Sequence, residues 1–261
     1  MKAISLCGGL LLAVLSFSGV VSATPAALKI DSFNGSYFLS RDSHGLSLLT
    51  TKETIVADFD DSGFYGLNRQ IPTSFSGHTV DVKILSVSDA AGDPLPYKTT
   101  AAGGYLNLVT GDPAVTLFGL QTFNINYQTS GVVNLHQATD EFLLDVNGRG
   151  WQGPINNVYG SLTLPSSLVA SLIGQPSCYT AVNVSQSTNC QLITKRSGSN
   201  TIISAQAANL VANQTLVIKT IFKPATFNDY RSTVKAWWWA APLVLILLIF
   251  YITRRLKSRP R

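Results

Sequence analysis

The sequence has few of the residues and motifs that carry out acid–base, nucleophilic or metal chemistry. Its three histidines, His44, His78 and His136, lie far apart, and no HExxH pair is present. It also contains no phosphate-binding glycine loop, no G-x-S-x-G turn and no S-x-x-K segment. We therefore expect no cofactor, no catalytic metal and no recognisable nucleophile.

Acidic residues form two clusters that could still carry chemistry. The segment from Asp58 to Asp61 resembles the start of a calcium loop, but its twelfth position is Arg69, where such a loop needs a bidentate glutamate. A solvated turn is the better interpretation. Glycosidase carboxylates are paired in space rather than in sequence, so Asp140, Glu141 and Asp145 stay candidates for hydrolysis of wall glycan or peptide.

The chain begins with an apolar run that is typical of a secretory signal. Residues 4–21 are apolar or small, follow a single lysine and lead to Val-Ser-Ala at 21–23. This pattern predicts a signal peptide over residues 1–23. The alternative is an uncleaved membrane anchor, because the apolar run is long for a signal peptide.

A second apolar run, residues 236–253, predicts a single transmembrane helix because it carries no charge and is just long enough to span the bilayer. Basic residues come directly after it, so residues 254–261 form a cytoplasmic tail and the preceding domain lies outside the plasma membrane. The lipid bilayer is thus the first expected partner. Interfacial positions are occupied by Trp237, Trp238, Trp239, Tyr251, Arg254 and Arg255.

The net charge of +5 comes from the two ends of the chain. Residues 24–235 hold 13 basic and 14 acidic side chains, which leaves the domain nearly neutral. The high isoelectric point therefore reflects topology, and we expect no nucleic-acid partner.

Cysteine usage agrees with export. Removal of Cys7 with the signal peptide leaves Cys178 and Cys190, an even number in an oxidising compartment. We predict that they form a disulfide, which would stabilise the fold by about 3 kcal/mol for a loop of this length.

The region between the apolar ends is mostly β in pattern. Short alternating or β-branched segments recur between glycine- and aspartate-rich turns, which predicts a mainly β fold, an antiparallel β-sandwich over residues 24–226. A short helix is expected at 165–174, and 227–235 is interpreted as a juxtamembrane linker. The strand patterns cover residues 79–87, 105–110, 121–128, 141–147, 158–164, 201–207 and 214–222.

The segment DEFLLDVNGRGWQGPI, residues 140–155, combines a strand pattern with a glycine-rich turn. Alternation places Phe142, Leu144 and Val146 on one face and Leu143, Asp145 and Asn147 on the other. Two interpretations stay open for the turn and the tryptophan after it. Trp151 either folds back as a buried structural residue or forms, beside Arg149, a platform on which a glycan stacks. Arg149 and Trp151 are therefore the candidate partner contacts.

The order and spacing of several segments resemble a family of predicted bacterial membrane proteins known as domain of unknown function 2207. These segments are GFYGLNRQIP (63–72), GLQTFNINYQTSGVV (119–133), DEFLLDVNGRGWQGPINNVYGSLTLP (140–165) and NLVANQTLVIKTIF (209–222). The chain departs from the family at Leu143 and Leu144, where many members carry an aromatic pair, and it stops soon after the first membrane helix. The resemblance implies an architecture and no reaction.

Two charged residues lie in segments shared with the family, Glu53 near the end of an early strand and Arg69 just before Ile-Pro. They suggest a structural ion pair that joins two loops. For function, we expect a membrane-tethered domain that binds another envelope protein or a surface polymer. The alternatives are a wall hydrolase that uses the acids of 140–145 and a truncated subunit that partners a longer paralogue.

Overall fold

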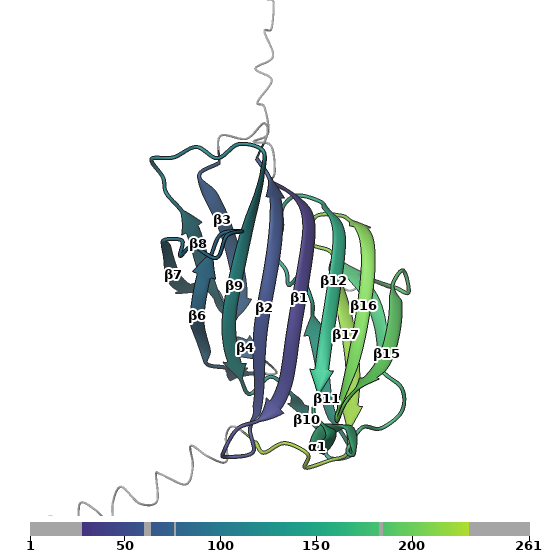
Figure 1. The fold of residues 1–261 in the computed structure, drawn as a ribbon. Coiled ribbons are helices and arrows are strands. Elements are labelled where there is room, and N and C mark those ends of the chain that lie inside the picture. The colour runs from purple at the N-terminus through teal and green to yellow at the C-terminus, as the bar shows by residue number, and fades with distance from the viewer. Residues whose placement is uncertain (1–27, 60–63, 76, 183–184, 230–261) are drawn as a thin grey trace, which may run out of the picture.

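The protein is described by a computed structural model that covers residues 28–59, 64–75, 77–182 and 185–229. Its front layer in Figure 1 is a seven-stranded sheet with the order β15-β16-β12-β1-β2-β9-β6. The strands of this large sheet are β1 (Lys29–Arg41), β2 (Ser47–Asp58), β6 (Val82–Ser88), β9 (Leu120–Ser130), β12 (Ile155–Leu164), β15 (Gln191–Ser197) and β16 (Asn200–Leu210).

Two smaller sheets lie behind the large one (Figure 1). The first has the order β10-β11-β17-β13-β14 and the second β3-β8-β7. The strands of the first are β10 (Asn134–Leu135), β11 (Asp140–Asp145), β13 (Ser177–Val182), β14 (Ser185–Ser187) and β17 (Thr215–Phe222). The second consists of β3 (Gly66–Pro72), β7 (Tyr97–Ala102) and β8 (Tyr105–Gly111), and a short hairpin joins β4 (Ser74–Phe75) to β5 (His78–Thr79).

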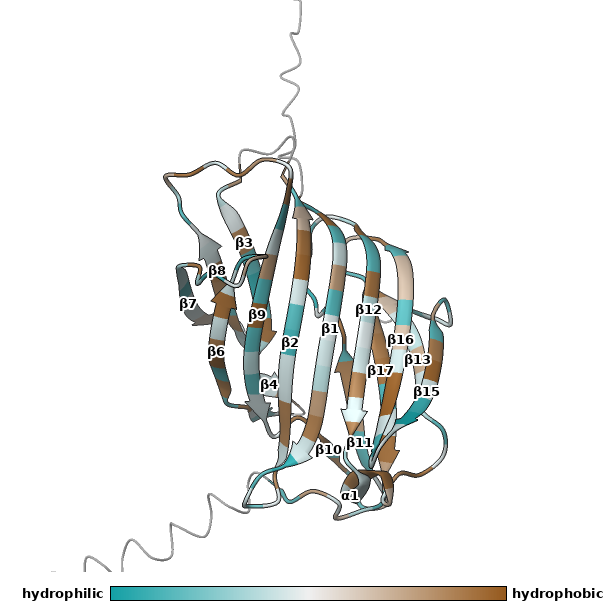
Figure 2. Ribbon diagram, viewed as in Figure 1, coloured by the Kyte–Doolittle hydropathy of each residue, from teal (hydrophilic) through white to brown (hydrophobic). Residues whose placement is uncertain are grey.

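The core lies between the two layers because side chains along each strand alternate between its faces. In β1, for example, Phe33, Tyr37 and Leu39 are buried, whereas Asn34, Ser36 and Phe38 are exposed. Figure 2 shows the resulting alternation of hydrophilic and hydrophobic positions along the strands. The predicted mainly β fold is confirmed.

The expectation of a purely antiparallel sandwich is wrong at one pair of strands. The neighbours β1 and β12 run parallel, in a register that extends from Ile30 opposite Ile155 to Phe38 opposite Thr163. Parallel neighbours need a long crossover connection. Here more than 100 residues, including the whole β3-β8-β7 sheet, separate the two strands along the chain.

The expected helix at 165–174 is a single turn, α1 (Ser166–Val169). The chain then returns to β pairing, because Leu172 bridges to Phe222 and the Ile173 amide donates a hydrogen bond of 2.8 Å to the Ile221 carbonyl. At the C-terminal side, Phe227 is buried against Phe222, with ring centroids 5.5 Å apart, so packed residues continue into the segment interpreted as a linker.

Across residues 28–59, 64–75, 77–182 and 185–229, no helix has the length and apolar character needed to span a bilayer. The predicted signal peptide, the predicted transmembrane segment 236–253 and the basic tail lie outside the described residues.

Candidate functional site

The corner after β11 is held by a buried tryptophan. Gly148 and Gly150 adopt positive φ angles of 65° and 91°, as a tight turn after the strand requires. The chain then brings Trp151 back into the core, where it is 7% exposed and its Nε1 donates a hydrogen bond of 2.7 Å to the Asn147 carbonyl. The interpretation of Trp151 as a surface platform is therefore wrong, because its ring packs edge-on against Phe33.

Arg149, the other candidate contact, is exposed and lies 3.3 Å from the Asp145 carboxylate. Phe142, Leu144 and Val146 are buried, as alternation predicts. Asn147 is buried too, against expectation.

Asn147 is buried because it bonds backbone groups on the far side of the corner. Its Nδ2 donates to the Gln214 carbonyl at 2.9 Å, and its Oδ1 accepts from the Leu216 amide at 2.9 Å. These two bonds satisfy polar groups that would otherwise be buried without partners. Strand alternation does not apply at Asn147, since β11 ends at Asp145.

Glu53 and Arg69 form a bidentate ion pair at the centre of the molecule. Arg69 Nε lies 2.8 Å from Glu53 Oε2 and Arg69 Nη2 lies 2.7 Å from Glu53 Oε1, and both residues are at most 2% exposed. Glu53 lies in the middle of β2, rather than near the end of a strand as expected, and Arg69 lies within β3, so the pair joins two strands rather than two loops. The pair therefore connects the large sheet to the β3-β8-β7 sheet behind it.

Further contacts surround this ion pair. Tyr127 donates a hydrogen bond of 2.7 Å to Glu53 Oε1, and Arg69 Nη1 donates one of 2.6 Å to the Gln70 carbonyl. The Arg69 guanidinium lies 5.7 Å from the ring centroid of Phe33 and 6.0 Å from that of Trp151, within the range of cation–π attraction.

Electrostatics keep the buried cluster in one protonation state. Burial and the nearby Glu53 carboxylate both raise the pKa of Tyr127, so its hydroxyl stays a donor. Burial alone would lower the pKa of Arg69, but Glu53, Tyr127 and Tyr37 together outweigh it and the net shift is upward. Both carboxylate oxygens of Glu53 accept hydrogen bonds from fixed donors, so the cluster suits a structural cross-link better than proton transfer.

The three candidate catalytic acids do not converge. Asp140 points into the core, where it accepts a hydrogen bond of 3.0 Å from the Phe227 amide. Glu141 and Asp145 lie on the opposite face of β11, and Glu141 pairs with Lys219. Asp145 pairs with Arg149 instead, so each of these two carboxylates is held by its own basic side chain.

Asp145 keeps a distinct environment. Burial raises its pKa, and the neighbouring Arg149 opposes the shift. In the other acidic cluster, Asp58 ends β2 at 3.8 Å from Lys29 and Phe59 is buried in the core, whereas residues 60–63 are not described. Among the described residues, no group of His, Cys, Asp or Glu side chains is arranged to hold a metal ion.

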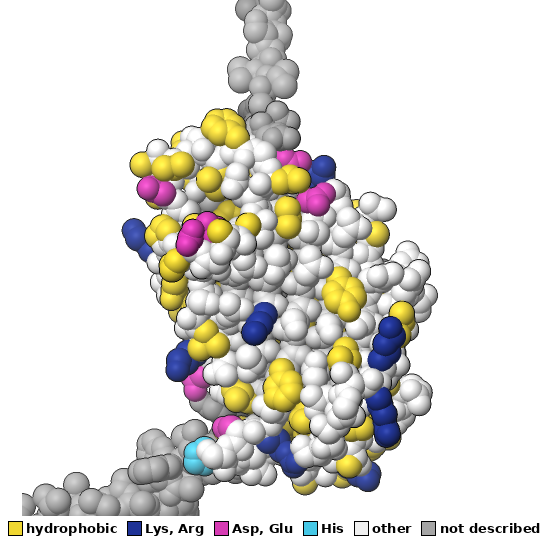
Figure 3. Space-filling model, in the orientation of Figure 1, with side chains coloured by type: hydrophobic (Ala, Val, Ile, Leu, Met, Phe, Trp, Pro, Cys, Tyr) yellow, Lys and Arg dark blue, Asp and Glu magenta, His cyan; other side chains and the backbone are white. Residues whose placement is uncertain are grey.

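The outer face of the large sheet carries mainly uncharged polar side chains. The pairing registers place exposed or half-exposed residues in rows across the strands. One row consists of Ser204, Ser161, Ser36, Lys52, Asn126 and Ser86. Figure 3 shows few charged side chains in the middle of this face, with most charged groups toward its margins.

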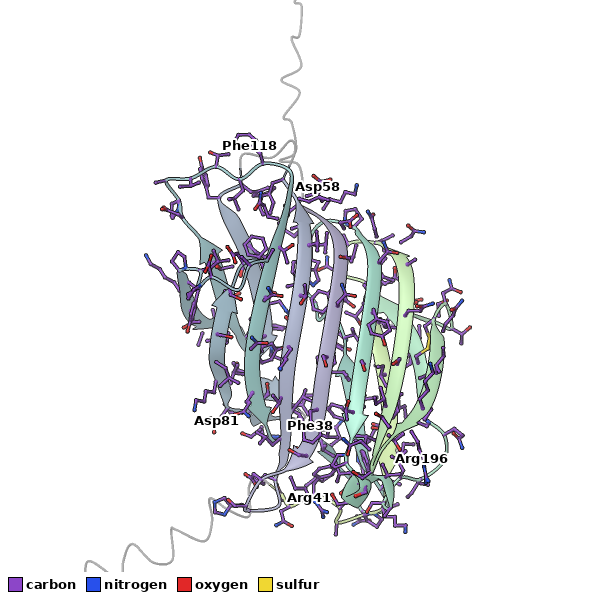
Figure 4. All side chains as sticks on the ribbon, viewed as in Figure 1. Phe38, Arg41, Asp58, Asp81, Phe118 and Arg196 are labelled. Atoms are coloured by element: carbon purple, nitrogen blue, oxygen red, sulfur yellow. A yellow bond between two sulfur atoms is a disulfide. The ribbon has the colours of Figure 1, made fainter. Side chains whose placement is uncertain are left out.

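Labelled residues confirm this distribution of charge. Phe38 lies on the face of the sheet, whereas charged residues lie around its perimeter in Figure 4: Arg41, Asp58, Asp81 and Arg196.

A hollow of about 490 Å³ opens on the same face, toward the β15 edge. The disulfide between Cys178 and Cys190, which the sequence predicted, links β13 in the rear layer to the loop that precedes β15. Cys190 itself lies in the wall of the hollow. The hollow is lined by Asn34, Asn157, Val158, Tyr159, Thr188, Asn189, Cys190, Gln191, Gln206, Ala207 and Ala208. Sequence reasoning missed it because its residues come from four separate strands and a loop.

Comparison with solved structures finds low-identity similarity to parts of larger proteins. A putative protease from Parabacteroides distasonis is 11% identical, with a TM-score of 0.43 over 74% of this chain and 40% of that one. An M1 zinc metallopeptidase from Deinococcus radiodurans is 8% identical, with a TM-score of 0.44 over 74% of this chain and 42% of that one. Leukotriene A4 hydrolase from Saccharomyces cerevisiae is 8% identical, with a TM-score of 0.45 over 75% of this chain and 29% of that one. The chain thus spans less than half the length of each of these proteins.

Comparison with curated protein sequences finds no match. A family model described as "Predicted membrane protein (DUF2207) N-terminal domain" matches residues 42–222, which include the buried ion pair, the tryptophan corner and the disulfide. The chain therefore belongs to this family of predicted membrane proteins, whose N-terminal domain it contains.

Proposed function

We propose that this chain is a membrane-anchored, extracytoplasmic binding module that recognises a component of the cell envelope through the outer face of its large sheet. Membership of a predicted membrane protein family supports the association with a membrane. The predicted signal peptide, transmembrane segment and basic tail support the orientation, with the β domain outside and the tail in the cytoplasm.

The observation that carries the proposal is the composition of that outer face. Soluble domains generally keep their surfaces hydrated with interspersed acidic and basic side chains. Here serine, threonine and asparagine occupy most central positions, and Phe38 and Tyr159 are about 40% exposed among them. Such a surface offers many donors and acceptors together with apolar contact area, at little cost of removing charges from water.

The hydrolase alternative receives no support from the geometry of the acids. Asp140 is buried, and Glu141 and Asp145 are each paired with a basic side chain. A subunit role beside a longer paralogue would use the same exposed face and becomes one outcome of the test.

Site-specific photo-crosslinking in intact cells tests the binding face. A photo-reactive residue at Ser36, at the centre of the outer face, is expected to yield crosslinked products. The matched control is Thr99, which is exposed on β7 in the rear layer and should yield few products. Digestion of the products with proteases or glycosidases then identifies a protein or a polymer partner. Equal yields from both positions, or none from Ser36, would remove the proposed face.

Cysteine labelling tests the orientation independently. Thr99→Cys is expected to react with a membrane-impermeant maleimide in intact cells, whereas Ser258→Cys in the basic tail should react only after permeabilisation. The reverse pattern would contradict an extracytoplasmic β domain.

A further inference from the structure

The hollow beside Tyr159 has a regular construction. Gln191, Gln206, Tyr159 and Asn34 form one continuous row across four neighbouring strands, from β15 to β1. Asn157 precedes Tyr159 by two residues on β12 and therefore lies on the same face. The floor of the hollow thus rests on hydrogen-bonded strands, which hold its side chains at fixed spacing.

Some polar groups of the hollow are fixed and others are available to a ligand. The Tyr159 hydroxyl donates a hydrogen bond of 3.0 Å to Ser204 Oγ, and Gln206 Nε2 donates one of 2.7 Å to Gln191 Oε1. These bonds orient the aromatic ring and one amide pair. The exposed side-chain amides of Asn34 and Asn157 have no hydrogen-bond partner within the described parts of the chain, and each can both donate and accept.

The lining selects against a charged ligand. None of the side chains around the hollow is charged, so an anion or a cation would lose hydration without gaining a counter-charge. A neutral sugar has the complementary chemistry, because its hydroxyls match amide groups and one face of its ring is apolar and fits a tyrosine ring. The volume of about 490 Å³ lies within the usual range for small-molecule sites.

We infer that this hollow is a glycan-binding site, in which a neutral sugar ring stacks on Tyr159 and bonds to Asn34 and Asn157. The inference rests on the proposed function and names the class of envelope component that is bound. The hollow opens onto the rest of the outer face, where Ser161 and Ser36 continue the polar surface. A polymer can therefore continue across the sheet beyond the ring held in the hollow.

The disulfide gives the site a rim of defined position. The loop at Thr188 and Asn189 ends at Cys190, which is bonded to Cys178 in the rear layer. Reduction of this bond frees one wall of the hollow without removing any lining side chain. Weaker glycan binding after reduction is therefore expected.

Glycan binding is tested with the full chain in lipid nanodiscs, which avoid sugar-based detergents. The probes are N-acetylchitotetraose, maltotetraose and cellotetraose as neutral oligosaccharides and oligogalacturonate as an acidic one, and binding is measured by saturation-transfer NMR. At least one neutral probe should bind, and Tyr159→Ala should weaken its binding at least tenfold. Tyr97→Ala is the matched control, since Tyr97 is 44% exposed on β7, outside the binding face, and Tyr159 is 41% exposed. This control should change binding less than twofold.

Asn157→Ala provides a second variant that keeps the aromatic ring, and it should weaken binding several-fold. If a neutral probe binds equally well to the wild type and to both hollow variants, the hollow is not the site. Preference for the acidic probe, or no binding of any neutral probe, overturns the neutral-glycan assignment. The proposed function survives either result if crosslinking from Ser36 still yields products, and it fails separately if crosslinking yields none.

Discussion

Charged side chains have different surroundings on the two faces of the large sheet, as the neighbouring residues Lys52 and Glu53 on β2 show. Lys52 is exposed in the middle of the outer face, with serine and asparagine beside it in the row. Glu53 points inward and is fully enclosed by Arg69, Tyr127 and the packed core. One residue along the strand thus separates a solvated charge from a buried one.

This difference in surroundings predicts which property, stability or binding, each charge affects. A buried carboxylate is tolerated only when its charge and its lone pairs are matched, and Arg69 and Tyr127 meet both conditions. On the outer face, water solvates the Lys52 ammonium, so no protein group has to match its charge. We therefore expect inner substitutions to change stability and outer substitutions to change binding.

The largest expected effect comes from removing the buried cation. Arg69→Met leaves the Glu53 carboxylate enclosed and without its counter-charge, which should lower the free energy of unfolding by about 3–5 kcal/mol. Chemical denaturation of the purified chain measures the loss. Lys52→Met, next to Glu53 on β2 but on the outer face of the large sheet, should change stability by less than about 0.5 kcal/mol. Similar values for the two variants would break the comparison.

An intermediate loss of stability is expected from substituting a glycine next to the buried ion pair, compared with a glycine that has no close neighbour. A Cβ at Gly148 would lie 2.5 Å from Arg69 Nη1, whereas a Cβ at Gly198 meets nothing within 4 Å. Both glycines have φ near 60–65°, so Gly198→Ala reports backbone strain alone, about 1 kcal/mol. Gly148→Ala adds displacement of the guanidinium and should cost about 2–3 kcal/mol. Thermal melting distinguishes them, and equal losses would show that the cluster accommodates the extra carbon.

The smallest effect concerns alkaline pH. Burial, reinforced by Glu53, raises the pKa of Tyr127 above its ordinary value of 10.0, so the native state keeps a proton that the unfolded state loses. The contribution of Tyr127 to the free energy of unfolding is therefore fully present below pH 10. It is lost as the pH rises above 10, by up to about 1.4 kcal/mol per pH unit for each such tyrosine. Tyr127→Phe should reduce this slope by that amount. An unchanged slope between pH 10 and 11 would argue against a buried, protonated Tyr127.

Tyr37 provides an independent check of the same effect. Burial and then Glu53 raise the pKa of Tyr37 too, and its hydroxyl donates to the Val146 carbonyl. Tyr37→Phe should therefore reduce the alkaline slope in the same direction.

Much of the fold follows from local patterns, and the exceptions have physical causes. Alternating segments such as 121–128 and 214–222 became β9 and β17. The bounds of the long strands β1 and β2 were not predicted, although an early strand was expected near Glu53, because serine, threonine and glycine interrupt their apolar alternation. Their β structure depends on neighbours on both sides, which a local pattern does not contain.

The candidate sites divide in the same way. The disulfide and the turn at Gly148 could be predicted because cysteine number and glycine spacing are local properties of the chain. The burial of Trp151 was one of the two interpretations that the sequence offered. The role of Asn147 could not be predicted, since its bonds depend on the start of β17, almost 70 residues away.

By itself, the sequence determined that this protein is built from β-strands, belongs to its membrane protein family and pairs Cys178 with Cys190. The sequence suggested the ion pair of Glu53 and Arg69, but only the tertiary structure decided that this pair is buried in the core and that Asn34 lies beside Tyr159 on the surface. The physical reason is register. A shift of one residue in any strand pairing would exchange the inner and outer faces, and that pairing is set by the packing of the whole domain.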